Sequence, residues 1–486
     1  TANEAADFSL YIDAPSIALS YVNDVLPASL QGKLTDGKAT DIAATVRREN
    51  GVYRYSGGLT IKDVAIDYDS YRLRNGNARI MLDGDTVTIA NGRMAVNDQQ
   101  LFANGVITLE GNTPHFNLRV QGHELDVAAL ANIGVTGRVG GEVYVRGTTE
   151  APDIYGRVTG RNIGYDGYTI TEVGADISYK NGLVKAEEFD ADVNDGHVTG
   201  QALYDTMDTS FEVRANAVAL PIGILGDVIG QPVYGTVSGG VYAKGQHADI
   251  TAMKATLHGE HVGTGELQFD TADVQVSGGQ GNYIITYANA TLGEGALTAY
   301  GTINGRELAI HANGSELPLA ALSGYVGKPL KGRVGVYADI TGTMDNPTAH
   351  GHMAVHDISA AGMDFSSAYA VFDLENQRVT VSPIALQTSD GGAYVGNGYV
   401  DLTGDKAMDM IVETKKTRIE KVAKAVTDVP VTGWVTAKTH ITGTMASPVV
   451  RGYVHAWDGS IYGKPPTDIK VAYGYGPHEV RTQPVQ

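Results

Sequence analysis

Three histidines are the residues whose types and spacing come closest to a metal site. His350, His352 and His356 form the pattern His-x-His-x3-His, and the first two would share one face of a strand, as zinc ligands can. No acidic residue or further histidine recurs in fixed register with them. The pattern therefore favours exposed strand histidines, and we predict that the chain has no metal site and no cofactor.

A second candidate is a calcium-binding loop. Asp190, Asp192, Asn194 and Asp195 resemble the start of such a loop. Asp195, however, stands where the loop requires glycine, and Gln201 stands where the closing glutamate belongs. The spacing thus argues against calcium binding.

Residue types that support catalysis are absent or lack a defined spacing. The chain has no cysteine, which excludes disulfides, thiolate catalysis and cysteine-ligated metals. No Gly-x-Ser-x-Gly, P-loop or dinucleotide-binding pattern occurs, and spacing does not single out a catalytic pair among 55 carboxylates. We predict that the protein is not an enzyme and has no catalytic residues.

The charge balance limits the partners. Lys and Arg number 36 against 55 Asp and Glu, a formal net charge of −19. Nucleic-acid binding needs a basic footprint, and docking on an anionic leaflet needs basic clusters, so both are disfavoured. The one dense basic cluster is interpreted as the solvated side of a helix; it comprises Lys415, Lys416, Arg418, Lys421 and Lys424.

No stretch of the sequence has the 18 or more apolar residues of a membrane span, and no signal peptide is recognised. Thr1 lies directly upstream of a repeat strand, and Gln486 lies part-way through a repeat. Both ends look like cuts in a longer protein, so we expect any membrane anchor to lie outside this sequence.

The candidate residues described above lie within a repeat of about one hundred residues, which must position them. In each copy an apolar position of a strand lies nine residues before the first apolar position of a short helix-like segment. The pairs are Phe8/Ile17, Phe116/Leu125, Phe211/Leu220, Leu308/Leu317 and Met410/Ile419, and the following strands begin near Gly32, Gly137, Gly235, Gly332 and Gly433. The pattern predicts modules over 1–115, 116–210, 211–307 and 308–409, with a partial fifth over 410–486.

Within each module apolar and polar residues alternate, which predicts strands with one apolar and one wet face. Frequent Asn-Gly and Asp-Gly pairs indicate antiparallel hairpins. We predict an all-β fold with short helices, an elongated and repetitive antiparallel-rich sheet curled into a U-shaped hydrophobic groove. The predicted groove residues are Phe116, Leu118, Val120, Phe211, Val213, Val274, Val276, Leu308, Ile310, Val379, Val381, Met410 and Val412.

Alternation alone leaves a second architecture open, because core residues of a filled trough or a stacked sandwich would alternate in the same way. An adhesin with a filled interior would also be long, acidic, cysteine-free and all-β, but with repeats near ~20 residues. A polysaccharide-active solenoid would need aromatic platforms and clustered acids on one outer face. The tyrosines here are scattered along the chain.

Three modules carry the same Gly-Thr-x3-Pro-x3-Gly motif. The copies are Gly147, Thr148, Pro152 and Gly156; Gly342, Thr343, Pro347 and Gly351; and Gly443, Thr444, Pro448 and Gly452. Gly245 marks a degenerate copy, and similar Leu-rich segments occur over 125–130 and 317–322. In this order the motifs resemble the repeats of the TamB and AsmA-like family of diderm bacterial envelopes.

The resemblance implies a fold and a function. Members of that family are anchored in the inner membrane, cross the periplasm as a hollow β-taco and are implicated in phospholipid transport toward the outer membrane. It thus implies a periplasmic, bridge-like lipid conduit that binds acyl chains in its groove and supports outer-membrane biogenesis. It also implies an inner-membrane anchor and an outer-membrane β-barrel partner, although no N-terminal anchor and no partner-binding segment are recognised here. The alternatives are a structural or adhesin-type repeat protein and a scaffold for outer-membrane protein assembly.

Overall fold

The structure is a computed structural model, and it divides into two units. It describes residues 7–21, 33–68, 71–110, 113–130, 134–165, 168–225, 232–247, 249–265, 267–323, 329–360, 363–389, 391–420, 429–444, 446–465, 468–476 and 479–484. Unit 1 comprises Thr1–Pro221 and Gly240–Asp249, and unit 2 comprises Ile222–Gly239 and Ile250–Gln486. Each unit is described by itself.

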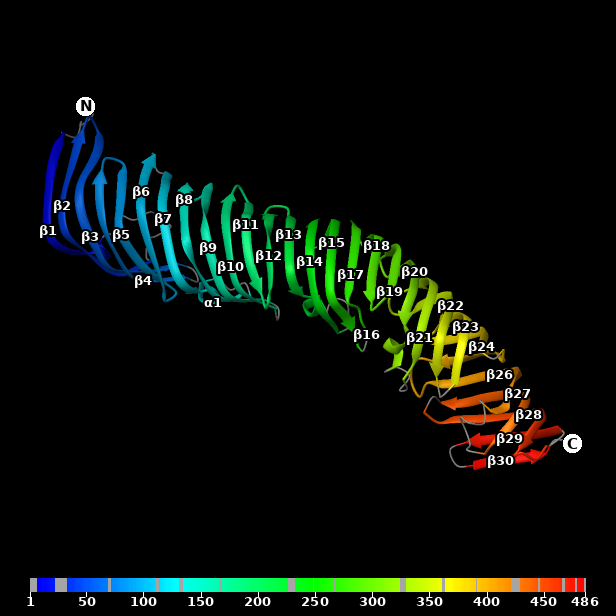
Figure 1. Cartoon of the computed structure of the whole chain (residues 1–486). Coiled ribbons are helices and arrows are strands. Elements are labelled where there is room, and N and C mark those ends of the chain that lie inside the picture. Colours follow the sequence, from blue (N-terminus) through cyan, green and yellow to red (C-terminus); the bar gives the residue numbers. More distant parts are fainter. Residues whose placement is uncertain are drawn as a thin grey trace. The chain divides into compact units, whose positions relative to one another are not determined.

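Unit 1 is an antiparallel sheet in which each strand pairs with the next one in the chain (Figure 1). Its strands are β1 (Phe8–Ala18), β2 (Leu34–Glu49), β3 (Val52–Tyr68), β4 (Tyr71–Asp83), β5 (Thr86–Val96), β6 (Gln99–Glu110), β7 (Thr113–Asp126), β8 (Thr136–Gly147), β9 (Pro152–Tyr165), β10 (Tyr168–Lys180), β11 (Leu183–Val193), β12 (Gly196–Asp205) and β13 (Ser210–Pro221). A one-turn helix, α1 (Val127–Leu130), follows β7.

Unit 2 is also an antiparallel sheet of mostly sequential strands, except that the strand Asp249–Thr264 pairs both with the two-residue strand that follows it and with the strand after that. β14 (Val233–Gln246) and β15 (Asp249–Thr264) contribute residues to both units. The remaining strands are β16 (Leu267–Gln268), β17 (Thr271–Gly279), β18 (Asn282–Leu292), β19 (Gly295–Asn304), β20 (Glu307–Pro318), β21 (Lys331–Gly342), β22 (Pro347–Ala360), β23 (Met363–Glu375), β24 (Arg378–Thr388), β25 (Ala393–Asp401), β26 (Ala407–Arg418), β27 (Val431–Thr444), β28 (Pro448–Ile461), β29 (Asp468–Gly476) and β30 (Glu479–Pro484). Its short helices are η2 (Ile222–Leu225) and η3 (Leu319–Leu322).

The predicted fold class is confirmed: the chain is almost entirely strand, with short helices, and forms an open, curled, antiparallel sheet. The five predicted modules stay a prediction, because the two units follow a coarser division. None of the helices among the described residues is long and apolar enough to span a membrane.

The Gly-Thr-x3-Pro motif forms the same hairpin turn in all three copies. In β8–β9 the amide of Thr148 donates to the carbonyl of Ala151 over 3.3 Å, and the amide of Ala151 donates to Thr148 Oγ1 over 3.1 Å. The β21–β22 and β27–β28 turns repeat both hydrogen bonds. The preceding glycine has a left-handed backbone, with φ of +84° at Gly147. The motif therefore forms a hairpin turn that is stabilised by the threonine hydroxyl, as in an ST-turn.

The helices begin two residues later than predicted. Leu125, Leu220 and Leu317 lie within β7, β13 and β20, and the helices start at Val127, Ile222 and Leu319. In β7 and β20 the residue before the leucine is left-handed, and the leucine side chain therefore folds over the glycine three positions back. An ideal Cβ on Gly122 would lie 2.5 Å from Leu125 Cδ1, and one on Gly314 would lie 2.6 Å from Leu317 Cδ1. Ile17 likewise lies in β1, whereas Ile419 is helical.

Glycine is required at the predicted strand heads because the backbone of the neighbouring strand lies too close for a side chain. Gly137 has a φ of +115°, and an ideal Cβ there would lie 2.5 Å from the carbonyl oxygen of Asn162 in β9, itself a left-handed residue. Gly235, Gly332 and Gly433 also have positive φ, and Gly32 lies outside the described residues. Left-handed residues inside strands accompany register shifts, which bend a strand.

We expect Gly137→Ala to destabilise unit 1 by roughly 3 kcal/mol, because the new Cβ meets fixed backbone atoms at a positive φ. The midpoint of urea unfolding measures the change. Gly240→Ala is the control, since no atom lies within 4 Å of its ideal Cβ and its φ is not in the left-handed region. Equal midpoints for the two variants would contradict this role of Gly137.

Candidate functional site

The predicted groove residues of unit 1 lie on one face of its sheet. Residues paired in register share a face, so a row of pairs can be followed from strand to strand. One row links Leu118 to Phe211 through Val145, Ile154, Tyr179, Val184 and Tyr204. The next row links Val120 to Val213 through Val143, Gly156, Ile177, Ala186 and Ala202. We call this side of the sheet the apolar face.

The predicted residues of unit 2 also share one apolar face. A row from Val276 reaches Ile310 and Val379 through Ile285, Gly301, Ile340, Ala349 and Leu374. The adjacent row from Val274 reaches Val381 and Met410 through Ala288, Ala299, Ala312, Ala338, Gly351, Phe372 and Gly398. Leu308 and Val412 lie two residues from Ile310 and Met410 on the same strands, and therefore face the same way.

All thirteen predicted residues, including Phe116, are half-buried, and none belongs to the fully buried core. Residues of a filled sandwich core would be mostly buried, whereas residues on a free surface would be mostly exposed. The intermediate burial is what a curved apolar wall produces when its own neighbours cover each side chain only in part.

One part of the apolar face is packed. In unit 2 a core cluster surrounds Phe365 and Tyr394, whose rings meet edge to face at a centroid distance of 5.7 Å. Leu317 and Leu319, at the end of β20 and in η3, pack against this cluster. Val412 packs against it too, so this predicted groove residue borders the filled part. The packing is concentrated at the strand ends next to the short helix.

Unit 1 contains a hollow on its apolar face, with a volume of about 240 Å³. Its lining is almost wholly aliphatic and comes from β3 to β7; it comprises Ile61, Asn77, Ala78, Ile80, Ile89, Gly92, Arg93, Met94, Val96, Leu101, Ala103 and Val120. Covering apolar side chains of this kind with another apolar group removes both from water, which is favourable. The hollow therefore suits an alkyl segment.

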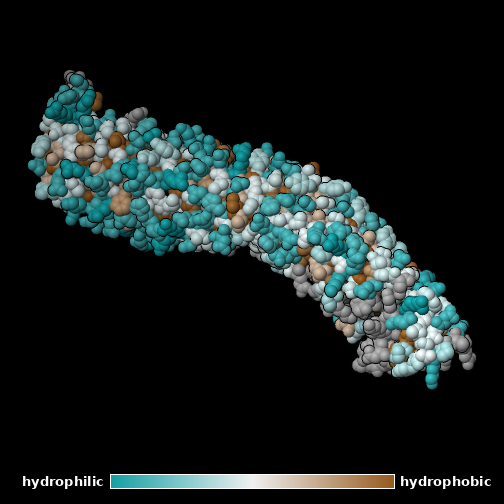
Figure 2. Space-filling model, viewed as in Figure 1, coloured by the Kyte–Doolittle hydropathy of each residue, from teal (hydrophilic) through white to brown (hydrophobic). Residues whose placement is uncertain are grey.

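The opposite face of each sheet is held by ion pairs and hydrogen bonds between neighbouring strands. Arg157 in β9 reaches Asp176 in β10 over 3.2 Å and Asp190 in β11 over 3.3 Å. Histidine–aspartate pairs recur across strands at 2.6–2.8 Å, as in His258–Asp273, His350–Asp373 and His440–Asp409. On the side visible in Figure 2 most residues are hydrophilic, with isolated hydrophobic ones between them.

Glu142 shows how strongly this polar face stabilises charge. Its carboxylate accepts hydrogen bonds from the guanidinium of Arg119, from Tyr144 Oη at 2.7 Å and from Gln121 Nε2 at 2.7 Å. The Arg119 hydrogen bond, followed by that of Tyr144, lowers the pKa of Glu142 from 4.5 to about 2. The same contact raises the pKa of Tyr144.

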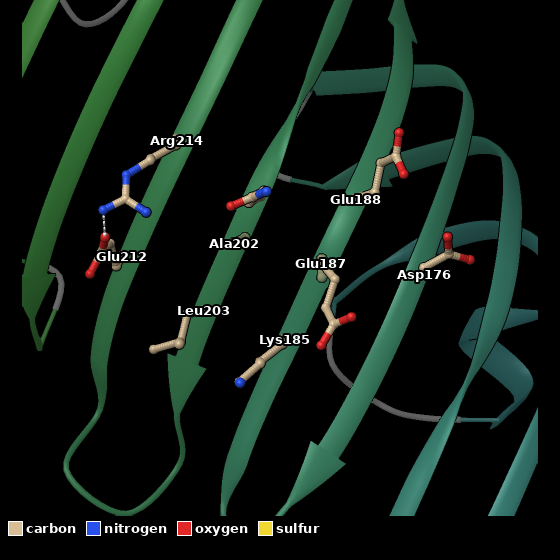
Figure 3. Close-up of a pocket in the computed structure, with 10 residues that line it drawn as sticks. Asp176, Lys185, Glu187, Glu188, Ala202, Leu203, Glu212 and Arg214 are labelled. Carbon is tan, nitrogen blue, oxygen red and sulfur yellow. Dashed lines mark ion pairs between the residues drawn. The ribbon is translucent and has the colours of Figure 1, made fainter.

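A polar hollow of about 680 Å³ lies on the polar face over β10 to β13, where β11 carries a register shift (Figure 3). Arg214 and Glu212 form an ion pair of 2.5 Å in it, and Glu187, Glu188 and Asp176 contribute carboxylates. In Figure 3 these carboxylates point in different directions and do not converge on one position. The hollow is a solvated depression beside a bulge.

The three histidines singled out in the sequence are held by different partners. His350 binds Asp373, His352 stacks on Tyr337 at a centroid distance of 5.6 Å, and His356 Nε2 lies 3.4 Å from Glu316. No group of three or more potential metal ligands occurs among the described residues.

The residues of the possible calcium loop have other partners as well. Asp190 pairs with Arg157 and Asp192 pairs with His197, while Asn194 and Asp195 form the hairpin turn between β11 and β12. These side chains do not surround a common centre.

The interpretation of the basic cluster as the side of a helix is wrong for its first three residues. Lys415, Lys416 and Arg418 lie on β26, because Thr417 pairs with Val435 and the strand continues past a register shift. Lys421 and Lys424 lie outside the described residues.

Several apolar-face residues were not singled out from the sequence. Val143 and Val145 alternate with Tyr144, and Ile154 lies in register with Val145, so strand alternation could have found them. Tyr179 and Tyr204 gave no such signal, since a tyrosine suits either face of a sheet.

We expect Glu142→Gln to lose less stability than the unmodified protein as the pH falls from 4.5 to 2. A carboxyl whose folded pKa is lowered to about 2 stabilises the fold above its ordinary value of 4.5, and this contribution is lost as the pH falls toward 2. Urea-unfolding midpoints across this pH range measure the effect, with Glu150→Gln, an exposed turn residue, as control. An unchanged acid profile in Glu142→Gln would contradict the strength of this contact.

Comparison of the chain with protein-family models, with curated proteins and with solved structures gave no match.

Proposed function

We propose that the apolar faces bind the acyl chains of phospholipids and conduct them along the sheet of each unit. The observation that supports this most directly is the row of aliphatic and aromatic side chains that crosses the successive strand pairs between Leu118 and Phe211. Most of them are half-buried, and Val184 and Tyr204 are exposed. Together with the family resemblance, it supports a periplasmic conduit between the inner and outer membranes. The inner-membrane anchor and the outer-membrane β-barrel partner are parts of this proposal.

The energetics of lipid transfer explain why a continuous face would matter. Moving one methylene from an apolar environment into water costs ~0.8 kcal/mol, so a two-chain lipid with about thirty methylenes would face a barrier above ~20 kcal/mol. A continuous apolar wall would keep the chains covered at each step while the head group stays in water.

Conduction would also require that no position bind the lipid tightly. The rows vary mainly among Val, Ile, Leu, Ala, Gly and aromatic residues, as in Val274, Ala288, Ala299 and Ala312. Such a surface offers many similar, shallow sites. In this proposal the protein is a non-catalytic carrier, in which the polar face supplies rigidity and solubility.

We expect Val213→Glu and Ile310→Glu to lower phospholipid transfer between vesicles at least tenfold, because a charge on an apolar path costs ~2.5–3.5 kcal/mol. Val412→Asp should block transfer as well, but it also perturbs the packed cluster that Val412 borders. Asn216→Glu and Asn313→Glu are the controls: they introduce the same charge at exposed positions of the same strands, on the polar face. Equal transfer by both sets of variants would show that the apolar face is not the path.

We expect delipidated protein to bind several phospholipids per chain, since the apolar rows extend over many strands in both units. Native mass spectrometry after incubation with short-chain phosphatidylglycerol measures the number bound. Absence of bound lipid would favour the structural or adhesin-type alternative instead.

A further inference from the structure

Both tryptophans of the chain lie next to each other in unit 2. Trp434 in β27 and Trp457 in β28 are paired in register, on the polar face of the sheet. Each is half-buried, and His455 packs against Trp457 at a centroid distance of 5.1 Å. The two indoles thus lie on neighbouring strands of the same face.

Two positive charges are held over the ring of Trp434. Lys416 Nζ lies 4.4 Å from the centroid of the Trp434 ring, and Arg418 Cζ lies 4.1 Å from it. Cation–π contacts at these distances hold the cationic groups close to the ring. Neither side chain forms an ion pair with a described residue, so both charges remain available to a ligand.

The surrounding surface is basic, unlike the chain as a whole. We call the polar face of β26 to β29 around the tryptophans the tryptophan patch. Its basic residues are all exposed: Lys415, Lys416, Arg418, Lys438, Arg451 and Lys470. The described acidic residues of these strands are Asp409, Glu413, Asp458 and Asp468.

Three of these acids have a partner within the patch. Glu413 contacts Lys415 over 2.6 Å and Lys438 over 3.1 Å, while Asp409 and Asp468 each bind a histidine. These strands thus carry six basic and four acidic described residues, and the basic residues that form no ion pair with a described residue are Lys416, Arg418, Arg451 and Lys470.

We propose that the tryptophan patch docks on the surface of a bilayer that contains anionic phospholipids. Lys and Arg near such a surface each contribute about 1 kcal/mol, and tryptophan is enriched at the depth of the head groups. An extended sheet face that carries several unpaired cations matches a plane of phosphate groups. The patch thus assigns to the polar face a membrane contact that is separate from lipid conduction on the apolar face.

The net charge of −19 does not prevent this contact. At physiological ionic strength the Debye length is about 8 Å, so charges farther from the bilayer than this distance are largely screened. The positive charge of the tryptophan patch itself then determines its interaction with the bilayer.

The tryptophans provide the assay, because the chain contains no others. The 486-residue chain is titrated with vesicles of phosphatidylcholine alone or with 30 mol% phosphatidylglycerol, and each type carries a lipid spin-labelled at its head group. We expect quenching of tryptophan emission and binding at least tenfold tighter with the anionic vesicles. Both effects should weaken as salt is added.

The variant Lys416→Gln/Arg418→Gln should bind the anionic vesicles roughly 30-fold more weakly, the equivalent of two contributions of about 1 kcal/mol. The matched control is Arg146→Gln/Arg214→Gln. These two arginines also form cation–π contacts, with tyrosine rings on the polar face of unit 1. The control should bind as the unmodified protein does.

Equal binding to both kinds of vesicle, absence of quenching, or equal loss in the two double variants would overturn the proposal. The salt dependence of the unmodified protein tests it without any variant. Docking and conduction are tested separately. In detergent-free native mass spectrometry, Lys416→Gln/Arg418→Gln should bind the same number of lipids as the unmodified protein. If the conduit proposal is wrong, no form of the protein will show this binding.

Discussion

The antiparallel backbone ladder is the constraint on which the rest of this structure depends. Successive strands pair residue by residue, so the side of the sheet that one side chain occupies determines the side of its partners on the next strand. A valine in β8 thus shares its face with an isoleucine in β9 and a tyrosine in β10. Through this rule, short alternating segments of sequence combine into apolar rows that cross each unit.

The ladder is modified at set positions, and these modifications separate the packed from the unpacked part of the apolar face. Left-handed residues such as Glu124 and Glu316 bend the strands close to the short helices and turn a leucine back over a glycine. Glycines such as Gly137 accept the close approach that results. Packing concentrates at these strand ends, while residues such as Leu118 and Ile310 in the middle of their strands stay half-buried.

The polar face has the complementary role. Its ion pairs join neighbouring strands at short distances, as for Lys180 and Asp153 at 2.8 Å. Exposed pairs of this kind each contribute little to stability. Their repetition, however, joins many of the neighbouring strands in a specific register, and this favours the observed register over a slip that would move apolar residues to the outside.

The sequence predicts the strands and their faces well, because period-two alternation and Asn-Gly turns are local signals. It predicts the helix starts poorly, since a left-handed residue such as Glu316 has no distinctive side chain. The strand position of Lys415 and Lys416 was missed because a register shift in β26 depends on pairing with β27. Whether an alternating face is filled or open depends on the curvature of the whole sheet, which short motifs do not encode.

The most direct test of the account is whether lipid contacts the apolar face. A photoreactive benzophenone amino acid is placed at Leu118 or Ile310, and in separate proteins at Asn117 or Asn313 on the same strands. After incubation with radiolabelled phospholipid and irradiation, we predict lipid adducts at Leu118 and Ile310 and little adduct at Asn117 and Asn313. Absence of adducts at Leu118 and Ile310, or equal labelling at all four positions, would contradict the account.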